Sequence, residues 1–284
     1  MPKRSFSDCL NDDKPLLLPV AHDALSARLI ERAGFSALTV GGFAMLGARH
    51  AIPDIGLAGL AEMLSGMRDI IEATDLPTLI DADDGYGDVK SVARTVRAYE
   101  KMGVSALLLE DQKSPKRCGH MAGKEVIPIA DMVRKIKVAI AERSNPETFI
   151  MARTDAGAVE GLDAALKRAE QYLDAGADGL FVEAPKSVEE LERVGKAFDV
   201  PQLANMLEDG RTPLISPSDL YEMGFAMVAY PTTLVFRIVR TMEKALEDLQ
   251  AERLKLEGEG VGFEQFKDVV GFPRWADIED KFGQ

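Results

Sequence analysis

The stretch Met102-Gly103-Val104-Ser105-Ala106-Leu107-Leu108-Leu109-Glu110 joins a glycine to an apolar run that ends in a carboxylate. The glycine stands at the end of an amphipathic window, which is the usual place for a helix C-cap. The same pattern occurs at residues 33–38, 175–180 and 223–228. The chain is therefore predicted to alternate helices with buried strands.

Eight short apolar runs are predicted to be strands, and amphipathic helical windows separate them. The runs cover residues 16–20, 37–40, 78–81, 106–110, 148–153, 179–183, 202–205 and 227–230. Strands that alternate with helices form parallel sheets with right-handed crossovers. Eight such units in 284 residues favour an α/β fold of the closed (β/α)8 TIM barrel type. An open dinucleotide-binding sheet is disfavoured, because no GxGxxG motif follows the first strand.

The sequence changes character after residue 231. A long helix is predicted from Thr232, and a glycine-rich run at 258–262 follows it. Because this run follows a helix and not a strand, we interpret it as a linker and not as a phosphate-binding loop. We predict one domain, residues 1–284, in which 232–284 form a C-terminal helical extension that packs on the barrel or on a neighbouring subunit. The apolar residues behind this prediction are Val235, Ile238, Val239, Met242, Leu246, Leu249, Phe263, Phe266, Phe272, Trp275 and Phe282.

The charge balance and the cysteine content limit the classes of function. The chain has 34 basic and 47 acidic residues, and its net charge of −13 repels nucleic acid and anionic membrane surfaces. We find no apolar stretch long enough to cross a membrane and no apolar signal segment near Met1. The two cysteines, Cys9 and Cys118, cannot form a disulfide framework. We expect a cytoplasmic protein, in which an acidic substrate would need local positive charge or a metal ion.

Polar residues end most of the predicted strands, and barrel enzymes collect their chemistry at the carboxyl ends of the strands. Each of these residues could by itself cap a helix or make a turn. Several of them on one rim indicate a functional site. The candidates are Gly41, Gly42, Phe43, Asp81, Asp83, Glu110, Arg153, Glu183, Asn205 and Pro231.

Asp81, Asp83 and Glu110 come from the ends of two adjacent strands and offer only oxygen ligands. The three histidines show no zinc-type spacing, and no CxxC motif is present. Oxygen ligands without thiolates are typical of Mg²⁺ or Mn²⁺, with water and substrate completing the coordination shell. The alternative is that these acids are solvated on the rim or cap helices.

The loop after Glu110 runs for roughly twenty residues, which is longer than the usual βα connection and typical of a lid. Within it, Cys118 is flanked by Lys116, Arg117 and His120. Positive charge lowers the pKa of a thiol toward neutrality, and a thiol that titrates near pH 7 suits proton transfer. From the local chemistry alone, Cys118 could equally be a proton donor, a nucleophile or an incidental cysteine.

Five motifs, in order along the chain, resemble the isocitrate lyase / phosphoenolpyruvate mutase superfamily. They are Asp81-Ala-Asp83-Asp-Gly-Tyr-Gly, Glu110-Asp-Gln, Lys116-Arg-Cys118-Gly-His120, Met151-Ala-Arg153-Thr-Asp155 and Ala204-Asn205-Met. The resemblance runs from about Leu16 to about Thr241. It implies a (β/α)8 barrel whose eighth helix is swapped between the subunits of a homotetramer. The branch of small enzymes that it points to contains 2-methylisocitrate lyases, 2,3-dimethylmalate lyases, oxaloacetate decarboxylases and phosphonomutases.

The resemblance also implies roles for individual residues. Mg²⁺ would be bound by Asp81, Asp83 and Glu110, in part through water. Cys118 would protonate the leaving carbanion and His120 would help to position the closed lid, and the set of expected catalytic residues is Cys118, His120, Arg153 and Asp54. The residues expected to contact the substrate are Gly41, Gly42, Phe43, Lys116, Gly119, Arg153, Glu183, Asn205 and Pro231. The base that takes the hydroxyl proton could be Asp54, a water on the metal or a neighbour of Arg153.

The expected function is Mg²⁺-dependent cleavage of a carbon–carbon bond in a 2-hydroxy diacid, of the 2-alkylmalate or 2-methylisocitrate type, to pyruvate or a related 2-oxo acid and a carboxylic acid. The alternatives are a carboxyphosphonoenolpyruvate-type phosphonomutase, an oxaloacetate decarboxylase or hydrolase, and a barrel that only binds. Thr39 and Gly41 depart from the tyrosine and the serine or threonine that many of the lyases carry. Because of these two departures, the motifs do not identify the substrate.

Overall fold

The computed structural model describes residues 4–10, 13–253 and 258–283. The chain divides into two compact units, Met1–Leu234 and Val235–Gln284, and we describe each by itself. The predicted start of the extension, residue 232, lies close to this division. The expectation that the chain is a single domain stays a prediction.

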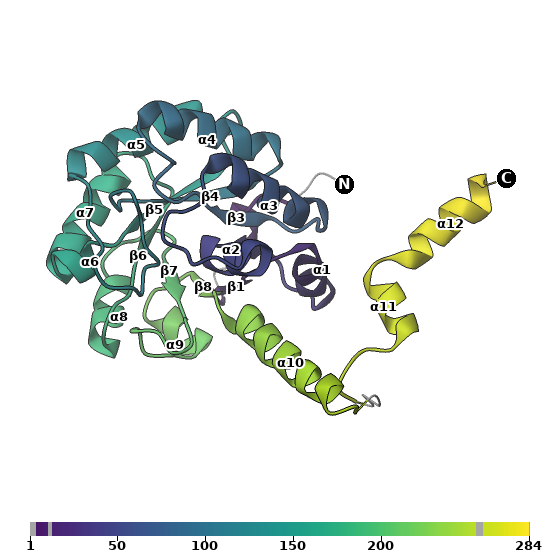
Figure 1. Ribbon diagram of the computed structural model, residues 1–284. Coiled ribbons are helices and arrows are strands. Elements are labelled where there is room, and N and C mark those ends of the chain that lie inside the picture. Colours follow the sequence, from purple (N-terminus) through teal and green to yellow (C-terminus); the bar gives the residue numbers. More distant parts are fainter. Residues whose placement is uncertain (1–3, 11–12, 254–257, 284) are drawn as a thin grey trace. The chain divides into compact units, whose positions relative to one another are not determined.

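Within its described residues, the first unit contains eight strands, all paired in parallel (Figure 1). They are β1 Leu16–Pro19, β2 Leu38–Val40, β3 Thr78–Asp81, β4 Ala106–Glu110, β5 Phe149–Thr154, β6 Gly179–Val182, β7 Leu203–Asn205 and β8 Met227–Tyr230. The strand orders are β1-β8-β7 and β2-β3-β4-β5-β6. The bridges Val20↔Thr39 and Leu180↔Gln202 join these two sheets into a ring. The predicted α/β barrel is therefore confirmed.

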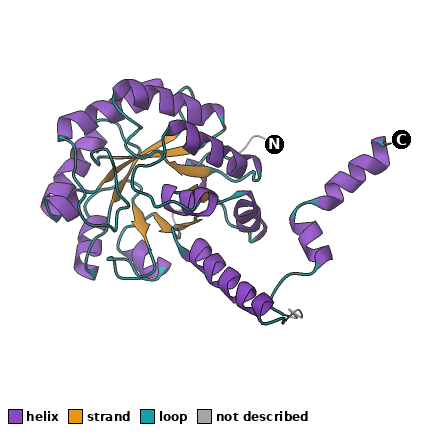
Figure 2. Ribbon diagram, viewed as in Figure 1, coloured by secondary structure: helices purple, strands orange, loops and turns teal. Residues whose placement is uncertain are grey.

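The helices of this unit surround the strands (Figure 2). They are α1 Ala24–Arg32, α2 Gly42–His50, α3 Leu60–Glu72, α4 Val89–Lys101, α5 Ile129–Glu142, α6 Ala156–Val159, α7 Leu162–Asp174, α8 Val188–Gly195 and α9 Pro217–Glu222, and a 3-10 turn, η1, covers Ser7–Cys9. Gly34, Gly103, Gly176 and Gly224 have φ values of +83°, +87°, +103° and +108°. These left-handed residues follow α1, α4, α7 and α9, as the recurring glycine pattern predicts, because a side chain is disfavoured there.

Two apolar layers form the core of the barrel. Neighbouring residues of each strand belong to different layers, because successive side chains point to opposite faces. In β4, Ala106 and Leu108 lie in the cluster inside the ring, and Leu107 and Leu109 lie in the cluster under the helices. The inner layer therefore fixes which strand-end residues face the barrel axis.

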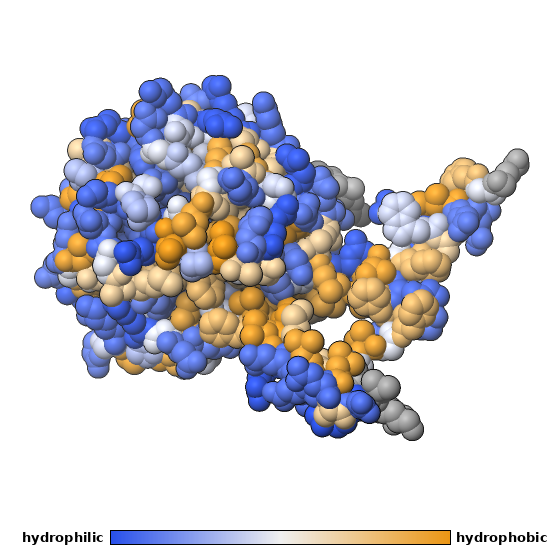
Figure 3. Space-filling model, viewed as in Figure 1, coloured by the Kyte–Doolittle hydropathy of each residue, from blue (hydrophilic) through white to orange (hydrophobic). Residues whose placement is uncertain are grey.

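The second unit is helical, with most of α10 Thr233–Gln250, all of α11 Phe263–Val269 and all of α12 Phe272–Phe282. Large apolar side chains are exposed on these helices, and Figure 3 shows several of them in orange. Met242 and Leu246 are each 61% exposed, Trp275 is 62% exposed and Phe263 is 78% exposed. A helix long and apolar enough to span a membrane is absent from the described residues.

Candidate active site

The register of the inner layer brings five predicted site residues to one end of the barrel. The cluster inside the ring contains the strand residues Leu79, Leu108, Met151, Phe181 and Leu203. Side chains two positions apart point the same way along a strand. The residues two positions further along the chain are Asp81, Glu110, Arg153, Glu183 and Asn205.

A cavity of about 90 Å³ lies at this carboxyl end. Asp83 and Glu110 adjoin residues of its wall, because Lys116 Nζ is 2.6 Å from Asp83 Oδ1 and Arg153 Nε is 3.4 Å from Glu110 Oε2. The structure therefore brings all the predicted site residues together. Those that line the cavity are Gly41, Gly42, Phe43, Asp54, Asp81, Lys116, Cys118, Gly119, His120, Arg153, Glu183, Asn205 and Pro231.

A larger cavity, of about 860 Å³, lies beside α9 and the amino ends of β1 and β2. Its wall contains Lys14, Leu16, Phe35 and Tyr221, and none of the predicted site residues. Barrel enzymes perform their chemistry at the opposite, carboxyl end of the strands. We therefore place the candidate active site at the smaller cavity.

The ammonium group of Lys116 lies between two acidic residues of the site. Lys116 Nζ is 2.5 Å from Asp54 Oδ1 and 2.6 Å from Asp83 Oδ1, and all three side chains are buried. Burial lowers the pKa of Lys116, but the surrounding carboxylates, first Asp83 and then Asp54, raise it well above its usual value. Lys116 therefore stays charged, and two protein carboxylates engage that charge.

The predicted metal ligands are carboxylates whose pKa values are raised although Lys116 and Arg153 lie nearby. Asp83 and Glu110 are buried and Asp81 is partly buried. Burial raises the pKa of Asp81, and the nearby charge of Asp83 adds to this. Burial also raises the pKa of Asp83, and it raises the pKa of Glu110 well above the usual range. Glu110 Oε1 makes no hydrogen bond within the part of the chain that the structure describes. This set of hard oxygen donors fits a divalent cation such as Mg²⁺.

The described residues do not supply a complete set of protein ligands for the ion. Within residues 4–10, 13–253 and 258–283, no three histidine, cysteine or acidic side chains lie close enough together to hold a metal by themselves. Mg²⁺ usually keeps several waters and binds through only one or two carboxylates. Mg²⁺ binding by Asp81, Asp83 and Glu110 therefore stays a prediction, with water as part of the shell.

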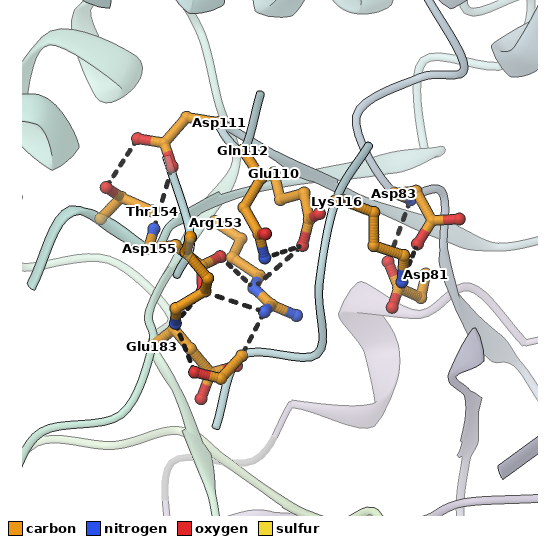
Figure 4. Close-up of polar contacts among 12 residues, drawn as sticks. Asp81, Asp83, Glu110, Asp111, Gln112, Lys116, Arg153, Thr154, Asp155 and Glu183 are labelled. Atoms are coloured by element: carbon orange, nitrogen blue, oxygen red, sulfur yellow. Dashed lines mark hydrogen bonds and ion pairs between the residues drawn. The ribbon is translucent and has the colours of Figure 1, made fainter. Parts of the chain in front are cut away.

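Arg153 lies at the centre of the polar network (Figure 4). Its Nε is 2.9 Å from Asp155 Oδ2 and 3.4 Å from Glu110 Oε2, and its Nη2 is 3.1 Å from Glu183 Oε2. Burial lowers the pKa of Arg153, but these carboxylates, first Asp155, raise it well above its usual value. Because protein groups hold the guanidinium in place, it presents a fixed positive charge to the cavity.

The environment of Cys118 corrects one prediction. Burial raises the pKa of the Cys118 thiol above its usual value, and the charge of Glu183 adds to this. The flanking positive charge does not reverse the shift, because Lys116 directs its ammonium at two carboxylates and Arg117 is exposed. Cys118 is therefore a protonated thiol at neutral pH, which suits a proton donor better than a nucleophile.

Both ring nitrogens of His120 lie close to polar atoms of other parts of the barrel. Nδ1 accepts a hydrogen bond from the backbone amide of Arg211 at 3.1 Å, and Nε2 lies 3.2 Å from Glu183 Oε1. Nδ1 accepts its hydrogen bond without a proton of its own, whereas the approach of Nε2 to Glu183 does not have the geometry of a hydrogen bond among the described residues. His120 thus lies between the long loop, the residue that follows β6 and the loop after β7, and its role in positioning the lid stays a prediction.

The loop after β2 brings backbone amides to the cavity. Gly41 is the N-cap of α2, so Gly42 and Phe43 lie in the first turn, where helix amides carry partial positive charge. A Cβ added to Gly42 would lie 3.2 Å from Asp54 Oδ1, so the backbone packs closely against the Asp54–Lys116 pair. This helix start can hold a carboxylate.

Several residues of the network were missed as site residues by sequence reasoning. The Gln112 side chain donates to the carbonyl of Arg117 at 2.8 Å and accepts from its amide at 2.9 Å, so it fixes the loop. Asp111 accepts from the Asp155 amide at 2.9 Å, which holds the end of β5. Lys124 Nζ lies 2.6 Å from Asp155 Oδ1. All of these residues stand inside the motifs or the loop, but their partners are distant in sequence.

We expect Gly119→Ala to reduce turnover by about 10²-fold, because a misplacement of about 1 Å in a catalytic site can cost this much. A Cβ at this position would overlap Glu183 Oε2 and would lie 2.6 Å from Arg153 Nη2. The loop would have to move away from the barrel. Steady-state kinetics and a melting curve would measure the effect, and the melting temperature should change little.

The matched control for this prediction is Gly47→Ala in α2, since a Cβ there meets nothing within 4 Å. Equal activity of the two variants would show that residue 119 does not pack against the cavity wall.

The sequence of the chain is similar to a known family and to several enzymes. Residues 6–250 match the family model described as phosphoenolpyruvate phosphomutase. The chain is 39% identical to 2,3-dimethylmalate lyase of Eubacterium barkeri over 97% of this chain and 96% of the relative. It is 47% identical to a probable 2-methylisocitrate lyase of Corynebacterium glutamicum over 82% of this chain and 75% of the relative.

Solved structures agree as well. An oxaloacetate acetylhydrolase in complex with 3,3-difluorooxalacetate superposes with a TM-score of 0.91 at 28% identity, covering 96% of this chain and 93% of that one. A phosphonopyruvate hydrolase in complex with oxalate and Mg²⁺ gives a TM-score of 0.87 at 25% identity, with 97% of each chain covered. The chain therefore belongs to the phosphoenolpyruvate mutase / isocitrate lyase superfamily and is an enzyme of that superfamily. Its relatives include carbon–carbon lyases and also hydrolases, so membership alone does not define the reaction.

Proposed function

We propose that the protein is a Mg²⁺-dependent carbon–carbon lyase that cleaves a 2-hydroxy diacid to pyruvate or a related 2-oxo acid and a carboxylic acid. The observation that carries this proposal is the position of the Cys118 thiol, which lies in the wall of the same cavity as Arg153. Burial raises the pKa of this thiol, which favours its protonated form. A proton donor beside a fixed cation suits a reaction that releases a carbanion. The lyases among the relatives support the same class.

The chain's residues account for the steps of such a cleavage. A base removes the proton of the C2 hydroxyl, the C2–C3 bond breaks, and its electron pair stays on C3 of the departing carboxylic acid. Arg153 and the first amides of α2 offset the charge of the two carboxylates and of the developing carbanion. The thiol of Cys118 donates its proton to C3, and the loop carrying Cys118 excludes water from the cavity.

Mg²⁺ held by Asp81, Asp83 and Glu110 would supply a Lewis acid for the substrate's oxygens. Asp54 is our candidate for the base, because its side chain lines the cavity. Lys116 Nζ lies 2.5 Å from its carboxylate and holds it in place. Gly119, Asn205 and Pro231 complete the wall against which the substrate would lie.

The cavity supports a small, doubly charged substrate. Its volume of about 90 Å³ is smaller than that of pockets for drug-sized ligands, and it suits a short diacid. Arg153 and the start of α2 offer two separate places for carboxylates. We therefore propose a dicarboxylate of the 2-alkylmalate type or a tricarboxylate of the 2-methylisocitrate type. The two places for carboxylates favour the dicarboxylate.

A substrate panel tests the proposed function. Purified protein with Mg²⁺ would be incubated with several 2-alkylmalates, 2-methylisocitrate, oxaloacetate and a phosphonate, and 2-oxo acid release would be followed by a coupled assay. We expect turnover of at least one 2-hydroxy diacid. Turnover of oxaloacetate or of the phosphonate alone would refute the proposal.

The second candidate is an oxaloacetate hydrolase or decarboxylase, with a carboxyphosphonoenolpyruvate-type phosphonomutase as a further possibility on the same scaffold. The likeness to oxaloacetate acetylhydrolase, with a TM-score of 0.91, favours the first of these. Oxalate among the products of oxaloacetate would identify the hydrolase, and CO₂ would identify the decarboxylase.

We propose that the protein forms a homotetramer in which the helix after β8 is swapped between subunits. The support is the apolar surface of the second unit, where Val239 is 52% exposed and Leu249 is 54% exposed. Such surfaces usually mark interfaces. Light scattering at micromolar concentration should give the mass of a tetramer, and a monomer would contradict the prediction. The cytoplasmic location stays a prediction from the sequence.

A further inference from the structure

The loop segment 112–124 contacts the network around Arg153 at two separate points. Lys124, at its end, places Nζ 2.6 Å from Asp155 Oδ1. His120, within it, places Nε2 3.2 Å from Glu183 Oε1. Asp155 and Glu183 both bind Arg153, at 2.9 Å and 3.1 Å (Figure 4). A chain of polar contacts therefore begins on the loop, passes through Arg153 and returns to the loop.

Lys124 is held almost entirely inside the protein. Its side chain is 2% exposed and that of Asp155 is 0% exposed. Its Nζ also donates a hydrogen bond to the carbonyl of Gly119, which belongs to the same loop. A buried charge without a partner is strongly unfavourable, so Lys124 can occupy this place only while Asp155 faces it. One ammonium group thus ties the turn of the loop to the end of β5.

Asp155 uses both carboxylate oxygens to set the plane of the Arg153 guanidinium. Oδ2 accepts from Nε at 2.9 Å, and Oδ1 accepts from Nη2 at 3.2 Å. Such two-point pairs fix geometry as well as charge. Oδ1 is also the atom that Lys124 binds, so the loop acts on the same carboxylate that orients Arg153.

We propose that Lys124 is a positioning residue that couples closure of the 112–124 segment to the orientation of Arg153 through Asp155. With Lys124 in place, the segment covers the cavity and Asp155 holds Arg153 toward it. With Lys124 withdrawn, Asp155 loses a charged donor and Arg153 loses its fixed plane. The consequence for turnover rests on the proposed function, but the consequence for the segment does not.

The first test follows the accessibility of Cys118, which lies in the segment, and needs no turnover. A Cys9→Ser background leaves Cys118 as the single thiol, and its rate of reaction with a soluble aromatic disulfide would be measured. Lys124→Met should raise this rate by about tenfold or more, because it removes the charge-assisted hydrogen bonds from Nζ to Asp155 and to the Gly119 carbonyl. The segment would then open more often and expose Cys118. Lys124→Arg should restore most of the protection.

The matched control is Lys113→Met. Lys113 lies on the same segment and pairs with Glu125 at 2.7 Å, but its side chain is 58% exposed. Its replacement should leave the labelling rate unchanged. Equal rates in the Lys124→Met and Lys113→Met variants, with unchanged melting temperatures, would overturn the proposal.

The second test measures the coupling to Arg153 with a double-mutant cycle on kcat. Lys124→Met should lower kcat by about tenfold, because Asp155 loses the charged hydrogen bond that helps it to orient Arg153. The same substitution should have little further effect in an Asp155→Asn background. Multiplicative effects of the two substitutions would show that Lys124 does not act through Asp155. If the unmodified enzyme cleaves no 2-hydroxy diacid, the proposed function fails, whereas the labelling rates still decide whether Lys124 holds the segment.

Discussion

Replacement of Cys118 by serine should lower kcat by about 10²–10⁴-fold, the usual contribution of a positioned general acid. Serine is nearly isosteric with cysteine but is a far weaker acid, so the carbanion would lose its proton donor. Because Cys118 contributes no charge to the site, binding of Mg²⁺ and of substrate should be preserved. Steady-state kinetics and calorimetric titration would separate these two effects.

Cys9→Ser is the matched control. Cys9 is buried in the inner cluster and its Sγ donates to the carbonyl of Ser36 at 3.4 Å, a contact that a hydroxyl can also make. It lines the cavity at the amino end of the barrel and not the candidate site. If Cys118→Ser keeps near-normal turnover on the best substrate, the thiol is not the acid and the oxaloacetate or phosphonate reactions become the better hypotheses.

Removal of divalent metal should have an effect of similar size. Asp81, Asp83 and Glu110 bring three carboxylates to a site that must also accept an acidic substrate. Protein carboxylates already engage Lys116 and Arg153, so a further cation is needed to offset the negative charge. Exhaustive treatment with EDTA should reduce turnover to below about one-thousandth, since a Lewis acid contributes several kcal/mol. Mg²⁺ or Mn²⁺ should restore it.

EDTA that is already saturated with Mg²⁺ provides the control for effects of the chelator itself. A melting curve supplies a readout that does not depend on activity, because a bound ion stabilises the native state by mass action. Full activity after exhaustive chelation, with no change in melting temperature on adding Mg²⁺, would remove the metal assignment.

The sequence predicts the barrel well because its signals are local. Thr78–Asp81, Ala106–Glu110 and Met227–Tyr230 have the predicted bounds. Other strand ends differ by about one residue; for example, β5 covers Phe149–Thr154 where 148–153 is predicted. Glycine C-caps and apolar runs depend on neighbouring residues only, so they can be found without the fold. The swapping of the last helix depends on a second chain, and the sequence supplies only the motif-based expectation.

The positions of the site residues are also predictable, because the alternation of side chains aims Asp81, Glu110 and Arg153 at the barrel axis. Their partners are less predictable. Lys124 and Asp155 are 31 residues apart, and no local pattern connects them. The loop must fold over the barrel before Lys124 can reach the end of β5.

The pKa of Cys118 shows why charges near in sequence mislead. The basic residues on either side suggest a lowered pKa, whereas burial raises it in the folded protein. Lys116 directs its charge at Asp54 and Asp83, 2.5 and 2.6 Å away. The effect of a charge on a neighbour depends on which groups already surround it, and this is set by tertiary structure.

The most direct test of the central claim is product analysis in D₂O with the best substrate of the panel. Cleavage with protonation of a carbanion predicts one 2-oxo acid and one carboxylic acid in equal amounts, with one deuterium on the carbon that was bonded to C2. Nuclear magnetic resonance would identify both products and the position of the label. Oxalate with acetate, CO₂ with pyruvate, or a rearranged phosphonate in place of these two products would contradict the account.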